Sequence, residues 1–302
     1  MANAADSKTN RVAPKSAART THARTARARE EAARHQRRQR ILWAVVASGL
    51  VVVLIAALVI AKATSGGKSS TPPAAAATPA VPASLLTNLA AIPPSQLAQA
   101  ERLVGSNVGA PSPISDAPLT SAGKPEVFYL GAEFCPYCAA ERWAMVVALE
   151  HFGSFSGLTE THSSSIDTDP NTPTFAFHGA TYSSPYISFV GVETTTNQPQ
   201  GNFYAPLDNP TAAQEALLEK YTQGTIPFVD FGGKAVIKSP QYDPKILAGL
   251  TVDQVAAQVP NLNTAIGQAV EASAARDISA ICQMTGGQPS SVCSAFAGSS
   301  AS

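Results

Sequence analysis

The sequence predicts an α/β domain, a mixed sheet flanked by helices, that follows a basic tail, one transmembrane helix and a linker. Three observations support this prediction. A run of strand-forming residues at 127–132 leads through Cys135-Pro136-Tyr137-Cys138 into a helical segment without Gly or Pro before Gly153. Further strand and helix patterns alternate downstream. An uncharged stretch of 21 residues, 41–61, separates a basic N-terminus from an acidic body.

The formal net charge of zero combines two oppositely charged parts of the chain. Residues 1–40 carry eleven Lys or Arg and three Asp or Glu, whereas residues 69–302 carry eight and eighteen. The tail 1–40 has hardly any large apolar side chain, so we expect it to be disordered. This basic tail is either a signal that sets the orientation of the chain in a membrane, called a topology signal, or an arm that binds nucleic acid. Its position beside the apolar stretch favours the topology signal, and we expect no nucleic-acid partner.

The stretch 41–61 is long enough to cross a hydrocarbon core of about 30 Å as a helix. Trp43 stands near its start, and the Arg-rich segment 37–40 precedes it. The positive-inside rule therefore predicts a single-pass protein of the cell membrane with a cytoplasmic N-terminus and an extracytoplasmic body. A cleaved signal peptide is the alternative, but the leading region and the apolar stretch are both long for one. In either case the part of the chain after residue 61 lies in an oxidising compartment, where disulfides persist.

The remaining elements are expected in the following order. Residues 62–83, rich in Pro, Ala, Ser and Gly, form a mobile linker to a domain at 84–302. Two helical patterns within 85–104 are divided by Pro93-Pro94, with Ser95 as the N-cap of the second. Strands are expected within 157–169 and at 174–177 and 186–193, and a helix at 212–221. A hairpin with a strand at 228–231 turns at Gly232-Gly233, and helices at 252–259 and 262–282 follow.

The four cysteines form two pairs in different settings. Cys135 and Cys138 open a helix, where free amide N–H groups and the helix dipole favour a thiolate. This setting favours thiol–disulfide exchange over a static disulfide or half of a zinc site. We expect no metal, because the spacing of Cys282 and Cys293 does not suit a second ligand pair, and no cofactor. For Cys282 and Cys293 a structural bridge is favoured, with a second redox pair as the alternative.

The order strand, Cys-x-x-Cys, helix, strand, helix, Thr225-Ile226-Pro227, hairpin and helix resembles the thioredoxin superfamily over about residues 120–260. With its tail and apolar stretch, the chain also looks similar to an uncharacterised family of membrane-anchored, extracytoplasmic thioredoxin-like proteins. The resemblance implies that Cys135 is the attacking nucleophile and Cys138 the resolving cysteine. It also implies that Pro227 is a cis-proline and that Ile226 contacts substrate.

The chain departs from the family pattern at three places. The interval between Cys135 and Pro227 leaves room for an insertion, which we place at 165–208. Phe134 stands where thioredoxins usually have Trp. Many members carry a buried acid six residues before the first cysteine, where this chain has Tyr129. Glu126 and Glu133 are near in sequence, and neither is assigned as the proton acceptor for Cys138.

These observations predict an enzyme, a membrane-anchored extracytoplasmic thiol–disulfide oxidoreductase that acts on protein thiols and disulfides of the cell envelope. Its redox partner is of unknown identity, and oxidase, reductase and isomerase activity all remain open. The alternative is a non-catalytic thioredoxin-like binding module of the cell envelope, in which Cys135 and Cys138 form a static disulfide. In the helix that follows the cysteines, Trp143, Met145 and Leu149 are expected to be core residues.

Overall fold

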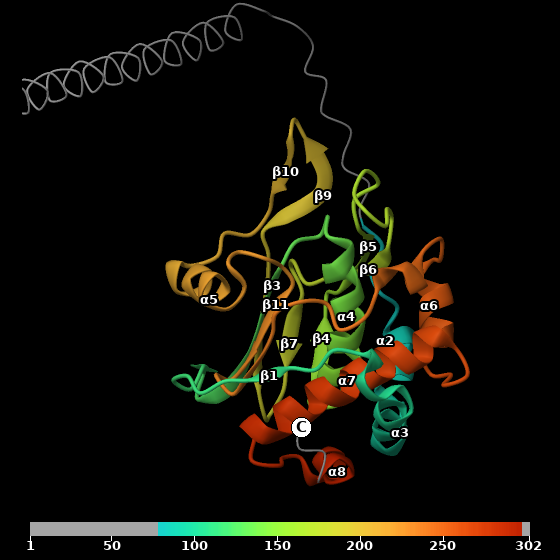
Figure 1. The fold of residues 1–302 in the computed structure, drawn as a ribbon, viewed down its shortest axis with the longest axis vertical. Coiled ribbons are helices and arrows are strands. Elements are labelled where there is room, and N and C mark those ends of the chain that lie inside the picture. The colour runs from blue at the N-terminus through green and yellow to red at the C-terminus, as the bar shows by residue number, and fades with distance from the viewer. Residues whose placement is uncertain (1–77, 298–302) are drawn as a thin grey trace, which may run out of the picture. The chain divides into compact units, whose positions relative to one another are not determined.

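The computed structural model describes residues 78–297, which fall within the unit Ala75–Ser302 (Figure 1). The expected tail at 1–40 and the expected membrane span at 41–61 lie outside the described residues. Within residues 78–297, none of the helices combines the length and the apolar character needed to cross a membrane. Ala80 and Val81, at the end of the expected linker, pair with Thr159 and Leu158 of the domain.

A mixed sheet forms the centre of the fold. Its central strand β3 (Lys124–Gly131) pairs in parallel with β8 (Ser188–Glu193) and antiparallel with β11 (Phe228–Phe231). Strand β12 (Ala235–Ile237) continues the sheet beside β11, and the short strands β1 (Ser112–Pro113) and β2 (Thr120–Ser121) pair with β12 and with the start of β3. The predicted mixed α/β class is confirmed.

Side chains of β3 alternate between two hydrophobic cores, as the period of a strand requires. Val127 and Tyr129 belong to the larger core, whereas Phe128 and Leu130 face the smaller one. Helix α5 (Ala212–Thr222) covers the smaller core with three half-buried side chains, Leu217, Leu218 and Tyr221. Its capping box, formed by Thr211 and Gln214, fixes where this helix begins.

Two long helices lie on the opposite face of the sheet, and the remaining helices apart from α5 pack against these two (Figure 1). Helix α4 (Pro136–Leu149) packs between the sheet and α7 (Ala265–Met284), and α3 (Pro94–Val104) lies along α7. Every residue of α4 except Tyr137 is buried, including the predicted core residues Trp143, Met145 and Leu149. The shorter helices are α2 (Ala83–Ala90), α6 (Val252–Gln258) and α8 (Ser290–Cys293), with 3₁₀ turns at Gly105–Asn107, Pro244–Leu247 and Ser294–Phe296.

Two expectations need correction. Helix α3 has Pro93 as its N-cap, so Ser95 lies within the first turn and caps nothing, because Pro94 suits the first helical position better. The insertion placed at 165–208 is not continuous, because β8 lies within it and belongs to the central sheet. The segments around β8 form two-stranded sheets: β4 (Ser154–Ser156) with β7 (Thr181–Ser183), β5 (Thr159–His162) with β6 (Pro173–Ala176), and β9 (Thr195–Gln200) with β10 (Phe203–Pro206).

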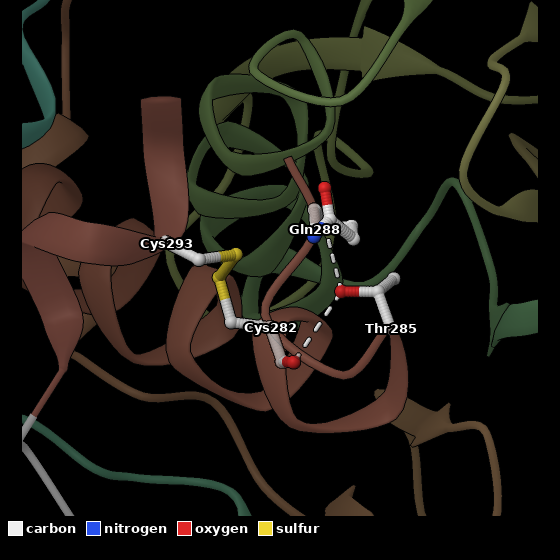
Figure 2. Close-up of a disulfide and its surroundings, with 4 residues drawn as sticks. All are labelled: Cys282, Thr285, Gln288 and Cys293. Carbon is white, nitrogen blue, oxygen red and sulfur yellow. Dashed lines mark hydrogen bonds between the residues drawn. A yellow bond between two sulfur atoms is a disulfide. The ribbon is translucent and has the colours of Figure 1, made fainter. Parts of the chain in front are cut away.

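A disulfide between Cys282 and Cys293 joins the end of α7 to α8, as the favoured interpretation of the sequence predicted (Figure 2). The Thr285 hydroxyl lies 3.3 Å from the carbonyl oxygen of Cys282 and 2.7 Å from that of Gln288. These contacts hold the turn that leads the chain from the end of α7 back toward Cys293.

Candidate redox site

Cys135 and Cys138 lie at the first turn of α4, where the sequence predicted them. Cys135 is the N-cap, and Pro136 occupies the first helical position, where a missing N–H costs nothing. The Cys135 Sγ accepts a hydrogen bond from the backbone N–H of Cys138 at 3.4 Å. Both cysteines are free thiols in this structure. The N-terminus of α4 therefore supplies a partner for a sulfur anion at Cys135.

The two thiols have opposite environments. A hydrogen bond from the Cys138 side chain lowers the pKa of Cys135 and, against the effect of burial, the Cys138 backbone N–H and the Arg142 charge lower it further. Burial raises the pKa of Cys138 well above its ordinary value, and the hydrogen bond and charge of Cys135 add to that rise. Cys135 is 5% exposed and Cys138 is not exposed at all. Of the two sulfurs, Cys135 is therefore the one that ionises more readily, and it is also the more accessible.

Three strand ends meet beside the cysteines. Gly131, the last residue of β3, is in register with Glu193, the last residue of β8. Phe228, the first residue of β11, is in register with Leu130, so Pro227 lies at the same edge of the sheet. Pro227 is buried, Ile226 is half-buried, and the peptide bond between them is cis. The sheet thus brings Pro227 and Glu193 to the end of the strand from which the cysteines follow.

A buried ion pair lies behind the cysteines. Arg142 Nε donates to Glu193 Oε1 at 2.7 Å, and its Nη2 donates to Glu193 Oε2 at 2.9 Å and to the Ala132 carbonyl oxygen at 2.7 Å. Neither side chain is exposed. The remaining donor group, Arg142 Nη1, is buried without a hydrogen-bond partner. Arg142 follows Cys138 by four residues, so the two side chains lie on one face of α4.

Tyr129 occupies the strand position at which the family resemblance would place a buried acid. Its ring lies 6.0 Å from Arg142 Cζ, and its hydroxyl is buried without a partner. A Cβ atom at Gly131 would overlap this hydroxyl, so a glycine is needed at that point. Burial raises the pKa of Tyr129 well above its ordinary value. The buried carboxyl of this site therefore comes from Glu193 on the neighbouring strand.

The two acids that were left unassigned lie in different places. Glu126 is near the start of β3, at the opposite end of that strand from the cysteines. Glu133 precedes Cys135 by two residues, and its backbone N–H donates to the Thr195 carbonyl oxygen at 3.0 Å. Burial raises the pKa of Glu133, while the Arg142 charge opposes that rise. Of these two acids, only Glu133 is part of the site.

An aromatic rim joins the cysteine segment to the β9–β10 hairpin. We use this name for Phe134, Tyr137, Phe203 and Tyr204. The rings of Phe134 and Tyr204 stack with centroids 4.2 Å apart, which attaches the β9–β10 hairpin to the segment before Cys135. Tyr137 is 39% exposed and Phe203 is 80% exposed. Exposed aromatic side chains thus occur both at Tyr137, two residues after Cys135, and at Phe203 on the hairpin.

Arg142 and Glu193 were not identified from the sequence. The available signal was a charged residue inside an otherwise apolar element: Arg142 follows an Ala-rich helical turn, and Glu193 ends the strand Ser-Phe-Val-Gly-Val. Buried charges require partners. Their partnership spans 51 residues, so it could be recognised only once β8 was paired with β3.

Residues 111–205 match the family described as a domain of unknown function, DUF929. The matched segment contains Cys135, Cys138, Arg142 and Glu193 but ends before Pro227. No curated protein and no solved structure matches the chain. Among residues 78–297, no group of His, Cys, Asp and Glu is arranged to hold a metal ion.

Proposed function

We propose that this protein is a thiol–disulfide oxidoreductase that acts on protein cysteines through Cys135 and Cys138. The observation that carries the proposal is the opposite environment of the two thiols. Cys135 is a helix N-cap with a lowered pKa, and Cys138 is a fully buried thiol with a raised pKa. An exchange reaction needs one sulfur that is a ready nucleophile and a second that stays protonated until it is required.

We further propose that the domain has the thioredoxin-like architecture. Supporting this, the sheet order β8-β3-β11-β12 combines one parallel pair with two antiparallel pairs. The cysteines follow the central strand, and α4 and α7 pack on one face while α5 packs on the other. The Thr225-Ile226-Pro227 segment, whose residues resemble the substrate-contacting loop of that superfamily, enters β11 at the edge where the cysteines lie.

The reaction balances without a cofactor. The Cys135 thiolate attacks one sulfur of a substrate disulfide, a mixed disulfide forms, and the other substrate sulfur leaves as a thiolate. Cys138 then attacks Cys135 Sγ, which forms the Cys135–Cys138 disulfide and releases the second substrate thiol. Two electrons pass to the substrate, and the reverse sequence oxidises a dithiol substrate. A protein dithiol or disulfide of the cell envelope, acting as redox partner, restores the starting state.

The aromatic rim supports polypeptides as the substrate class. Tyr137, two residues after Cys135, and Phe203, on the hairpin that Tyr204 joins to Phe134, both present exposed apolar surface. A small thiol would leave this surface uncovered, whereas an extended chain with apolar residues near its cysteine would bury it. Ile226, half-buried at the same edge, is the proposed contact for the substrate backbone.

We propose an extracytoplasmic location, with residues 41–61 as the membrane anchor. The Cys282–Cys293 disulfide supports this location, because such bonds persist in oxidising compartments and are rare in the cytosol. Protease added to intact cells is expected to remove the body and to spare the N-terminal tail. A soluble product that begins just after residue 61 would instead indicate a cleaved signal peptide.

Trapping of the mixed disulfide tests the proposed activity. In the full chain, Cys138→Ala is expected to accumulate disulfide-linked partners through Cys135, because attack still occurs but resolution does not. Cys135→Ala is the matched control and is expected to accumulate none. If Cys138→Ala traps no partner while Cys135 still reacts with an alkylating reagent, the static binding module becomes the better description.

A further inference from the structure

We infer that Glu193, held in place by Arg142, is the proton acceptor for Cys138 when Cys138 resolves the mixed disulfide. This inference rests on the proposed exchange function and names a residue for one of its steps. It answers a question that the geometry raises, because Cys138 is fully buried and its thiol has no direct contact with solvent that could take the proton.

The geometry of the buried ion pair is the first argument. Cys138, Arg142 and Glu193 are all fully buried, and Arg142 lies one helical turn after Cys138 on the same face of α4. Its guanidinium joins Glu193 by two hydrogen bonds, at 2.7 and 2.9 Å. Glu193 is therefore a carboxyl group within this buried cluster, and its charge acts on the Cys138 thiol.

Two unpartnered donors are the second argument. Arg142 Nη1 and the Tyr129 hydroxyl are both buried without a hydrogen-bond acceptor while both cysteines are thiols. A buried donor without a partner costs about 1–3 kcal/mol. A thiolate at Cys138 is an acceptor for such donors, so the cluster is arranged for a state in which Cys138 carries the negative charge.

Conservation of charge is the third argument. Creating a second buried anion beside Glu193 would be costly in a low-dielectric interior. Transfer of the Cys138 proton to Glu193 keeps one cation and one anion in the cluster before and after the step. Arg142 remains the cation, and its ionic partner changes from the Glu193 carboxylate to the Cys138 thiolate.

The step is balanced in atoms and electrons. Glu193 takes the proton from the Cys138 thiol, and the Cys138 thiolate attacks Cys135 Sγ of the mixed disulfide. The Cys135–Cys138 bond forms, the bond from Cys135 to the substrate sulfur breaks, and the substrate leaves as a thiolate. That thiolate finally takes up a proton, and Glu193 returns to its ionised, Arg142-paired form.

Several other titratable groups face this cluster. Tyr129 approaches from β3 and Cys135 from the N-terminus of α4, while Glu133 lies in the loop between β3 and α4. Asp208 Oδ2 accepts a hydrogen bond from the Glu193 backbone N–H at 3.0 Å, and His178 Nδ1 lies 2.7 Å from Asp208 Oδ1. Burial raises the pKa of Glu193 against the opposing effect of Arg142, which makes its carboxylate a better proton acceptor.

The test compares Glu193→Gln with the wild-type full chain, using a peptide that contains one disulfide as substrate. Formation of the Cys135–Cys138 disulfide is followed between about pH 5 and 9, around the ordinary thiol pKa of about 8.5. We expect resolution near neutral pH to slow by about 10²-fold and the rate profile to move to higher pH. For the first step, Cys138→Ala/Glu193→Gln is compared with Cys138→Ala alone, and the added Glu193→Gln change is expected not to slow it. The matched control is Glu141→Gln, which changes a different fully buried carboxyl, on α4. It is expected to keep the wild-type dependence of the resolution rate on pH.

The outcomes are distinguishable. An unchanged rate and pH profile in Glu193→Gln, or an equal loss in both steps, would overturn the inference. If the wild-type chain itself does not exchange with the peptide, the proposed function fails instead. Should Glu193→Gln not fold, Glu193→Asp provides the test, because it keeps an ionisable carboxyl but shortens its reach by one methylene. Slower resolution with an unchanged first step is expected, and wild-type rates in both steps would overturn the inference.

Discussion

Arg142 and Glu193 are joined by two hydrogen bonds in a region from which solvent is excluded, and each is the other's charge partner. Removing one member leaves an uncompensated buried charge. We expect Arg142→Met to lower the free energy of unfolding by about 3–5 kcal/mol. The double variant Arg142→Met/Glu193→Leu removes both charges, and its free energy of unfolding is expected to fall clearly less than that of Arg142→Met. Urea unfolding of the full chain, followed by near-ultraviolet circular dichroism, measures both. Equal losses in the single and double variants would show that packing, and not charge, is what the pair supplies.

Local patterns identified much of the fold before any contact was known. The helix α4 could be predicted because no Gly or Pro follows Cys138 before Gly153, and the strand at 228–231 because three of its four residues are strand formers and Gly232-Gly233 follows. Cys135 and Cys138 stood out for the same reason, since their spacing and their place at a helix start are visible in sequence. The Cys282–Cys293 bridge was also predicted, from compartment and spacing.

Partnerships between distant residues were not predictable in this way. Nothing near Glu193 in the sequence indicates Arg142, and nothing near β8 indicates that it pairs with β3 in preference to a separate insertion. The N-cap of α3 was wrongly placed at Ser95, because Pro94 at the first helical position offered a competing local solution that residue preferences alone do not rank. Sequence thus located the cysteine pair, whereas the buried charges around it depend on tertiary packing.

The Cys282–Cys293 disulfide is expected to stabilise the C-terminal region without taking part in exchange. A closed loop of about 12 residues contributes roughly 3 kcal/mol in the chain-entropy description. Replacing both cysteines with Ala should lower the melting temperature by about 10 °C for a domain of this size. Calorimetry measures that shift, and the peptide assay measures exchange in the same preparation. Loss of exchange with an unchanged melting temperature would favour a second redox pair.

The reactivity of Cys135 is expected to depend on a donor at position 138. The hydrogen bond from the Cys138 side chain is the largest cause of the lowered pKa of Cys135. Cys138→Ala removes this donor, so the pKa of Cys135 should rise and its alkylation near neutral pH should slow severalfold. Cys138→Ser retains an O–H donor and should preserve most of the wild-type rate. The measurement is the alkylation rate of Cys135 against pH, with the Cys282–Cys293 disulfide intact. Identical profiles for the Ala and Ser variants would contradict this explanation.

A second buried acidic cluster, away from the cysteines, should make stability depend on pH. Glu141 on α4 and Asp277 on α7 are fully buried and are linked through Gln241, whose backbone N–H lies 3.4 Å from Glu141 Oε2 and whose Nε2 donates to Asp277 Oδ1 at 3.1 Å. The other oxygen of each carboxyl has no hydrogen-bond partner. Burial raises the pKa of Glu141 from 4.5 to about 8. Burial, followed by the charge of Glu141, raises the pKa of Asp277 well above its ordinary value.

The sign of the effect follows from these directions. Because the folded-state pKa of Glu141 is raised, the folded protein binds more protons than the unfolded chain between pH 4.5 and about 8. The contribution of Glu141 to stability is fully present below that window and is lost as pH rises through it. We therefore expect the free energy of unfolding to fall by a few kcal/mol across the window. Glu141→Gln, which cannot ionise, should flatten this dependence and be more stable than wild type near the upper limit. Urea unfolding at a series of pH values tests this, and parallel curves for the two proteins would rule out Glu141 as the source.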